Sequence, residues 1–139
     1  MRPDVGIVGY VPGVFDMFHI GHLNLIRRAR LECDYLIAGV VSDAVGFELK
    51  DRYPAIPEDE RIEVVSSIRF VDEVHMEQTV DKFQTWEILK FDVVFKGDDW
   101  KGSAKWCQLE ERFATVDVGV VFLPYTPHLS TSERRRKLD

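Results

Sequence analysis

The sequence is poor in cysteine, has no excess of basic residues and contains no long apolar run, and each of these shortages excludes a class of protein. Two cysteines in 139 residues are too few for a disulfide framework or a zinc cluster. With 18 Lys and Arg against 24 Asp and Glu, the formal net charge of −6 provides no basic field for a nucleic-acid backbone. No run approaches the roughly 18 apolar residues that cross a bilayer, and the first residues lack a signal-peptide core. We therefore expect a cytoplasmic protein that binds neither nucleic acid nor membrane.

Two common phosphate-binding motifs are missing as well. The sequence contains neither the P-loop pattern Gly-x-x-x-x-Gly-Lys-[Ser/Thr] nor the dinucleotide pattern Gly-x-Gly-x-x-Gly. These absences weigh against a P-loop kinase and a dehydrogenase. A chain of 139 residues, of which 45% are hydrophobic, is nevertheless long enough to bury a core, and it suits one domain covering residues 1–139.

Short apolar runs alternate with helical patterns along the whole chain. The apolar runs predict strands over residues 5–11, 35–41, 71–74, 91–95 and 116–123. Helical spacing predicts helices from Ile20, over 58–68, 80–89 and 106–113, and from Ser130 or Thr131, with a loop over 47–57. This alternation predicts an α/β fold, a Rossmann-like three-layer sandwich with a mainly parallel five-stranded sheet.

The residues least typical of a structural core follow the predicted strands. They occupy segments 13–22, 42–43, 97–100 and 124–132. Ligands of parallel α/β folds bind beyond the carboxyl ends of the strands. We therefore expect these segments to converge on one crevice.

His19-Ile20-Gly21-His22 is the most informative of these segments. Two imidazoles three residues apart at a strand-to-helix junction can both face a phosphate from the first helical turn. Packing or surface roles are the alternative for an isolated pair, and a metal role is less favoured because no third ligand is nearby. The hydroxyls of Ser130, Thr131 and Ser132 at a predicted helix start suit a further anion site, with a plain N-cap as the alternative.

Taken in order, these motifs resemble those of the cytidylyltransferase-like nucleotidyltransferases, which share His-x-Gly-His with class I aminoacyl-tRNA synthetases. The resemblance extends from Gly9 to about Ser132 and is strongest to the enzymes that act on glycerol 3-phosphate and phosphocholine. It is carried by Val14-Phe15-Asp16, the histidine pair, Lys50, Glu60-Arg61, Ile68-Arg69-Phe70-Val71-Asp72-Glu73-Val74, Gly97-Asp98-Asp99-Trp100 and Ser130-Thr131-Ser132.

The resemblance implies attack of a phosphomonoester oxygen on the α-phosphorus of CTP, which releases pyrophosphate and forms a CDP-linked product. Glycerol 3-phosphate is the first-choice acceptor, and Mg²⁺ would be held mainly by the CTP phosphates, with no assigned protein ligand. The resemblance also implies a homodimer with residues 69–74 near the interface. An adenylyltransferase acting on a sugar or polyol phosphate is one alternative, and a nucleotide-binding regulatory module without turnover is the other.

The same resemblance implies roles for individual residues. The catalytic residues would be His19, His22, Lys50 and Arg69. The nucleotide would be bound by the histidine pair together with Val14, Phe15, Gly97, Asp98, Asp99, Trp100, Tyr125, Thr126, Ser130, Thr131 and Ser132. The acceptor would be bound by Asp16, Asp43, Lys50 and Arg61. Arg52 could take the role of Lys50, and the alternative for Lys50 is a solvated charge on a loop. For Asp43 the alternative is a helix cap, and for Arg61 it is an ordinary position on a helix surface.

Two positions depart from the family pattern. Val14 stands where the family has threonine, so the hydroxyl is absent. Tyr125 stands where the family has arginine, and a phenol cannot make the bidentate phosphate contact of a guanidinium group. We therefore expect a nucleotide affinity or preference that differs from the family's.

Overall fold

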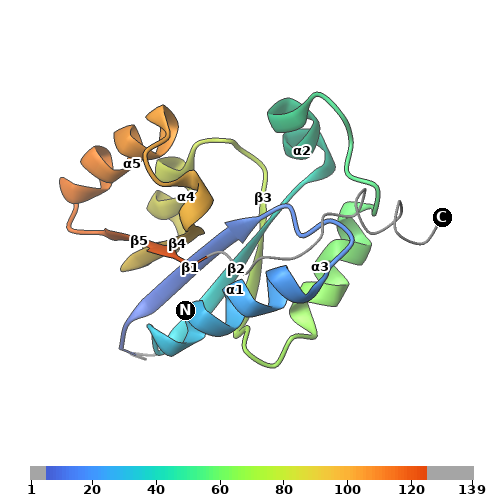
Figure 1. Ribbon diagram of the computed structural model, residues 1–139, viewed down its shortest axis with the longest axis horizontal. Helices are drawn as coiled ribbons and strands as arrows, with labels where there is room; N and C mark the ends of the chain where they lie inside the picture. Colours follow the sequence, from blue (N-terminus) through green and yellow to red (C-terminus); the bar gives the residue numbers. More distant parts are fainter. Residues whose placement is uncertain (1–5, 125–139) are drawn as a thin grey trace.

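The computed structural model describes residues 6–124, which form one parallel sheet with helices on both sides (Figure 1). The strands are β1 (Val8–Gly13), β2 (Tyr35–Val41), β3 (Glu73–Glu77), β4 (Val93–Gly97) and β5 (Gly119–Leu123). The helices are α1 (Ile20–Leu31), α2 (Asp43–Lys50), α3 (Glu58–Ser66), α4 (Lys82–Leu89) and α5 (Ala104–Ala114), with a short 3₁₀ turn, η1 (Asp98–Trp100).

The strands lie in the order β3-β2-β1-β4-β5, and all of their pairings are parallel. β1 pairs with β2 along its whole length, from Val8 opposite Tyr35 to Gly13 opposite Val40. The chain winds outward from β1 to β3 and then returns to place β4 on the other side of β1. The switch point of the sheet therefore lies between β1 and β4, and the predicted Rossmann-like α/β fold is confirmed.

Each face of the sheet is covered by its own apolar core. On one face, Ile26 of α1 and Val65 of α3 pack against the strands. On the other face, Leu89 of α4 and Phe113 of α5 do so. α2 covers neither face and lies beyond the carboxyl end of β2 (Figure 1). None of the described helices is both long and apolar enough to cross a membrane.

Gly39 in β2 lets the side chain of Tyr10 cross over the neighbouring strand. A Cβ atom at position 39 would lie 2.0 Å from the Tyr10 hydroxyl oxygen, which donates to the buried carboxylate of Glu77 at 2.5 Å. Gly39→Ala is therefore expected to displace the ring and to lower the free energy of unfolding, measured in urea, by about 1–3 kcal/mol. Gly119→Ala is the matched strand control, because its added Cβ would lie 3.8 Å from Val93 Cγ2. Equal stabilities of the two variants would contradict this packing.

The ends of four strands differ from the predictions, and among them β4 covers residues 93–97 where 91–95 was predicted. β1 starts at Val8 rather than at residue 5 and continues through Pro12, which lies beyond Tyr10, the last residue of β1 that pairs with β4. The strand predicted over 71–74 runs from 73 to 77, and the last strand starts at 119 rather than 116. Asp117, with φ of 62°, forms a turn where the prediction continued the strand.

α2 was not predicted, because its second half falls in the segment interpreted as a loop over 47–57. Ser42 caps its start by accepting a hydrogen bond from the Val45 amide at 3.1 Å. Asp51 ends it in the left-handed region, at φ of 58°. The predicted terminal helix from Ser130 or Thr131 lies outside the described residues.

Candidate functional site

A cavity of about 510 Å³ opens at the carboxyl ends of the strands, at the switch point of the sheet. Its walls come from the loop after β1, the first turn of α1, α2 with the loop that follows it, the end of β4 with η1, and the starts of α4 and α5. Of the segments predicted to converge, 13–22 and 97–100 therefore meet there, whereas 42–43 does not line the cavity and 125–132 lies outside the described residues.

The first turn of α1 places both histidines at the cavity. His19 is the N-cap of α1, and its Nδ1 accepts a hydrogen bond from the Gly21 amide at 3.1 Å. The His19 amide donates to His22 Nδ1 at 3.2 Å, so the two residues form a capping box. Their rings stack with centroids 3.9 Å apart. The three-residue spacing therefore caps the helix and aligns the two rings at once.

These backbone contacts determine which ring nitrogen carries the proton. A nitrogen that accepts a hydrogen bond has no proton of its own, so in each neutral imidazole the proton lies on Nε2. Both side chains line the cavity, next to the positive end of α1. The pair can therefore present two Nε2–H donors to an anionic oxygen.

The loop before α1 holds two residues in an unfavourable backbone conformation. Phe15 and Met17 have φ of 53° and 50°, in the left-handed region that residues with side chains rarely adopt. The buried Phe15 ring meets the His22 ring edge-on with centroids 5.5 Å apart, and Phe18 packs on the same histidine at 5.3 Å. Such strain persists where the surrounding packing holds it, and here that packing positions His22.

Asp16 ties two loops of the site together. Its carboxylate oxygens accept hydrogen bonds from the Ala55 and Ile56 amides at 2.8 and 2.9 Å. These bonds fix the loop before α3 to the loop after β1. Asp16 also lines the cavity, and its predicted contact with the acceptor stays a prediction.

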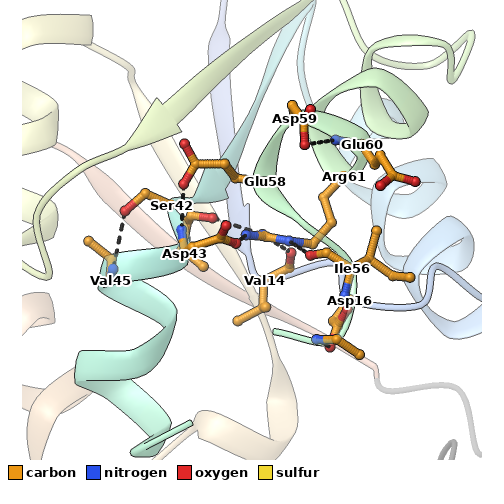
Figure 2. A network of polar contacts seen from close by, with 12 residues as sticks. Val14, Asp16, Ser42, Asp43, Val45, Ile56, Glu58, Asp59, Glu60 and Arg61 are labelled. Carbon is orange, nitrogen blue, oxygen red and sulfur yellow. Dashed lines mark hydrogen bonds and ion pairs between the residues drawn. The ribbon is translucent and has the colours of Figure 1, made fainter. Parts of the chain in front are cut away.

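Arg61 of α3 is buried between the ends of β1 and β2 (Figure 2). Its guanidinium group donates to the carbonyl oxygens of Val14, Val41 and Ile56 and to Asp43 Oδ1, each at 2.8 Å. The side chain is 1% exposed and does not line the cavity. Arg61 and Asp43 therefore hold the backbone around the site in place. The burial of Arg61 contradicts the helix-surface alternative for that residue, while the predicted contact of both residues with the acceptor stays a prediction.

The α2 side of the cavity provides two exposed cations, Lys50 and Arg52. Lys50 is the last residue of α2, and Arg52 follows the left-handed Asp51. The Phe47 and Tyr53 rings pack together at 4.7 Å beside them. Both cations that the sequence suggested for phosphate contact thus reach the cavity, and the choice between them stays open.

A chain of buried polar groups on another wall was not predicted from the sequence. Glu77, at the end of β3, is fully buried. Its Oε2 accepts from the Tyr10 hydroxyl at 2.5 Å, and its Oε1 accepts from Lys82 Nζ at 2.6 Å. Burial, together with the Glu77 charge, raises the pKa of Tyr10 well above its ordinary value, so the phenol stays protonated and donates. The charge of Glu77 is thereby matched by Lys82, the first residue of α4.

Lys96 and Lys105 bring two further positive charges to this wall. Lys96 is on β4, and its Nζ lies 5.1 Å from the centroid of the Trp100 ring and 5.9 Å from that of Trp106. Burial, reinforced by Lys82, lowers the pKa of Lys96 from 10.5 to about 8. The pKa of Lys105 is lowered by the same two causes. The sequence analysis did not single out these lysines, and the one signal it offered was a lysine at the carboxyl end of a buried strand.

The structure brings together most of the described residues that the motifs single out. Those lining the cavity are Val14, Phe15, Asp16, His19, His22, Lys50, Gly97, Asp99 and Trp100. Asp98 belongs to η1 but is not among the lining residues. Outside the described residues lie Tyr125, Thr126, Ser130, Thr131 and Ser132, whose nucleotide contacts stay predictions.

Arg69 does not lie at the cavity. It is exposed in the turn between α3 and β3, with its guanidinium carbon 5.0 Å from the centroid of the Phe70 ring. Arg27, in the C-terminal half of α1, lies over the same ring at 5.6 Å. The turn therefore packs near the end of α1 remote from His19, and the structure separates Arg69 from the catalytic residues predicted beside it.

Comparison with known proteins places the chain among enzymes of one family. A family model described as cytidylyltransferase-like matches residues 10–137. The chain is 32% identical over 130 residues to the glycerol-3-phosphate cytidylyltransferase of Bacillus spizizenii, which covers 91% of this chain and 92% of that protein. It is 33% identical over 116 residues to the FAD synthase of Pyrococcus abyssi, which covers 83% of this chain and 78% of that protein.

The fold comparison agrees with the sequence comparison. The crystal structure of the lipopolysaccharide core biosynthesis protein from Thermoplasma volcanium matches with a TM-score of 0.74 at 20% identity, covering 89% of this chain and 99% of that one. The matched family segment contains the whole capping box of α1 and nearly all of the sheet that carries it. With its histidine-lined cavity at the switch point, the chain belongs to the cytidylyltransferase-like family of nucleotidyltransferases.

Proposed function

We propose that the protein transfers a cytidylyl group from CTP to a small phosphomonoester, with glycerol 3-phosphate as the first acceptor to test. The observation that carries the proposal is the pair His19 and His22, whose Nδ1 atoms accept hydrogen bonds from backbone amides and whose side chains both line the cavity. The similarity to the glycerol-3-phosphate cytidylyltransferase of Bacillus spizizenii, over 91% of this chain, supports both the nucleotide and the acceptor.

The proposed reaction needs positioned charge rather than a covalent intermediate. An oxygen of the acceptor phosphate bonds to the α-phosphorus of CTP while the bond from that phosphorus to the bridging oxygen breaks, and pyrophosphate leaves with the electron pair. The two Nε2–H groups stabilise the charge on the α-phosphate oxygens, and Lys50 or Arg52 reaches the same phosphates from the α2 side. Trp100 of η1 lines the cavity, and we assign it the contact with the base.

Mg²⁺ is proposed as a cofactor bound mainly by the CTP phosphates. Within residues 6–124, no group of three or more His, Cys, Asp and Glu side chains is arranged to hold a metal ion. Phosphate oxygens are ligands that Mg²⁺ prefers, and the bound ion would neutralise part of the triphosphate charge.

A homodimer is proposed with the segment 69–74 near its interface. The last two residues of this segment begin β3, which forms one edge of the sheet, and Arg69 before that strand is exposed. Sedimentation at micromolar concentrations tests this directly. A species of twice 16.1 kDa is expected, and a single 16.1 kDa species would contradict the proposal.

A pyrophosphate-release assay tests the proposed function. Pyrophosphate is expected only when CTP, Mg²⁺ and a phosphomonoester are all present, together with a CDP-linked product of matching mass. Because FAD contains an adenylyl group and an FAD synthase is among the relatives, ATP with FMN and ATP with sugar phosphates are run in parallel. Turnover with ATP alone would favour an adenylyltransferase. CTP binding without pyrophosphate release in the presence of any acceptor would favour a binding module.

A further inference from the structure

One wall of the cavity carries more positive charge than its own carboxylates match. Lys82, Lys96 and Lys105 reach this wall from α4, β4 and α5. The buried carboxylate beside them, Glu77, has both oxygens engaged, by Lys82 Nζ at 2.6 Å and by the Tyr10 hydroxyl at 2.5 Å. Lys82 and Glu77 therefore neutralise each other. The half-buried Lys96 and the exposed Lys105 are left without a matching carboxylate among the described residues.

No carboxylate in the described part of the chain lies within ion-pair distance of Lys96 or Lys105. Asp99 of η1 lines the cavity and attracts Lys96, but it is exposed to water and forms no ion pair with it. The Lys96 ammonium group instead faces the rings of Trp100 and Trp106. Burial lowers its pKa to about 8, as expected for a cation without a partner. Within the described residues, the positive charge of this wall is therefore not fully matched by carboxylates.

An anion that would match this charge differs from the phosphates that react. Under the proposed function, the α-phosphate and the reacting acceptor phosphate are contacted by His19, His22 and the cations after α2. The excess charge comes from different elements, β4 and α5. A second anionic group on a molecule already in the cavity would satisfy it. Among the cavity-lining residues, the end of the acceptor opposite its reacting phosphate has only the untested contact with Asp16 assigned to it, so we place the anionic group there.

We propose that Lys96 and Lys105 bind a second anionic group of the acceptor, a carboxylate or phosphate at the end opposite its reacting phosphate. This inference rests on the proposed function and narrows its acceptor class. Acceptors with an anionic end are bound best, those with a neutral diol less well, and those with a cationic end worst.

Matched acceptor pairs test the preference. 3-Phosphoglycerate and glycerol 3-phosphate share a three-carbon skeleton and differ by a carboxylate in place of a hydroxymethyl group. 2-Phosphoglycolate and ethanolamine phosphate form a two-carbon pair with opposite end charges. Glycerol 1,3-bisphosphate, compared with 3-phosphoglycerate, tests whether a second phosphate is bound better than a carboxylate. The anionic member of each pair is expected to have the higher kcat/KM, by about tenfold or more.

The Lys96→Met variant tests whether the preference for anionic acceptors depends on this wall. The variant is expected to raise the KM for 3-phosphoglycerate by about tenfold, while the KM values for CTP and glycerol 3-phosphate change by less than about twofold. Lys101→Met is the control, because Lys101 is exposed in the neighbouring turn and does not line the cavity. It is expected to behave as the wild type.

Three results would overturn the inference. One is a wild-type kcat/KM for glycerol 3-phosphate that equals or exceeds the value for 3-phosphoglycerate. Another is an effect of Lys96→Met on the KM for CTP that exceeds its effect on the acceptor, which would assign the lysines to the nucleotide. If no acceptor is turned over, the proposed function fails, and calorimetric titration of 3-phosphoglycerate then decides the subsite alone. Weaker binding of 3-phosphoglycerate to the Lys96→Met variant than to the wild type supports the subsite, and equal binding to the two proteins overturns it.

Discussion

His19→Asn is expected to lower kcat by about 10²–10³-fold with little change in melting temperature. Asparagine is a favourable N-cap residue, and its Oδ1 is as many bonds from Cβ as His19 Nδ1 is. It can therefore keep the hydrogen bond from the Gly21 amide. It has no group at the position of Nε2, so the donor to the α-phosphate is lost. Pyrophosphate release at saturating CTP and acceptor, with a thermal melt of the same sample, measures both effects.

His19→Gln is the reciprocal variant. Its terminal amide lies at the bond distance of Nε2 and can donate, but it lacks a well-placed cap acceptor. It is expected to keep more of kcat than His19→Asn and to lose about 1 kcal/mol of stability. His75→Gln on β3, outside the cavity lining, should leave the rate unchanged. If kcat instead follows stability across the variants, His19 serves the helix cap alone, and the proposed function loses its central observation.

The fold and the histidine pair could be predicted because both depend on local pattern. A parallel strand covered on both faces must be apolar throughout, and residues 35–41 were predicted and observed as one strand for that reason. The position of His19 at the carboxyl end of the sheet follows from a strand before it and a helix after it. α2 was not predicted because its exposed residues include Phe47 and Leu49, so its apolar residues do not lie on one helical face.

The remaining parts of the site depend on contacts between residues far apart in the sequence. Tyr10 and Glu77 are 67 residues apart, and their hydrogen bond needs both the strand order and a glycine at position 39. The partners of Arg61 are backbone carbonyls, which no residue pattern reveals. A single strand-end lysine such as Lys96 looks like an ordinary surface charge until two other lysines converge on it.

Lys96→Met is expected to raise the free energy of unfolding by about 2–3 kcal/mol near pH 7. In the wild type, folding moves an ammonium group from water to a half-buried wall. The charged groups that act on it come from four surrounding elements, and they are Glu77 of β3, Lys82 of α4, Asp99 of η1 and Lys105 of α5. Because the Glu77 charge is matched by Lys82, these groups leave most of the burial cost uncompensated. Methionine has a similar length and no charge, so it avoids that cost.

The stabilisation by Lys96→Met is expected to disappear at high pH. The pKa of Lys96 is about 8 in the folded protein and 10.5 at its ordinary value, so below pH 8 the group is charged in both states and the cost is fully present. Between these values the folded protein has released the proton that the unfolded chain still holds. Wild-type stability then rises relative to the variant, by up to about 1.4 kcal/mol per pH unit. Above pH 10.5 the free energies of unfolding of the two proteins should converge.

Urea denaturation at several pH values, with Lys101→Met as the exposed control, measures this difference. A Lys96→Met protein less stable than wild type at neutral pH would mean that the lysine makes a net favourable contact and that its wall needs no further anion. The complementary measurement adds 3-phosphoglycerate. The wild type should gain more stability from it than Lys96→Met does, because a ligand that binds only the folded state stabilises it in proportion to its affinity. A charge that destabilises the empty protein and strengthens the complex is what a binding residue, rather than a structural one, requires.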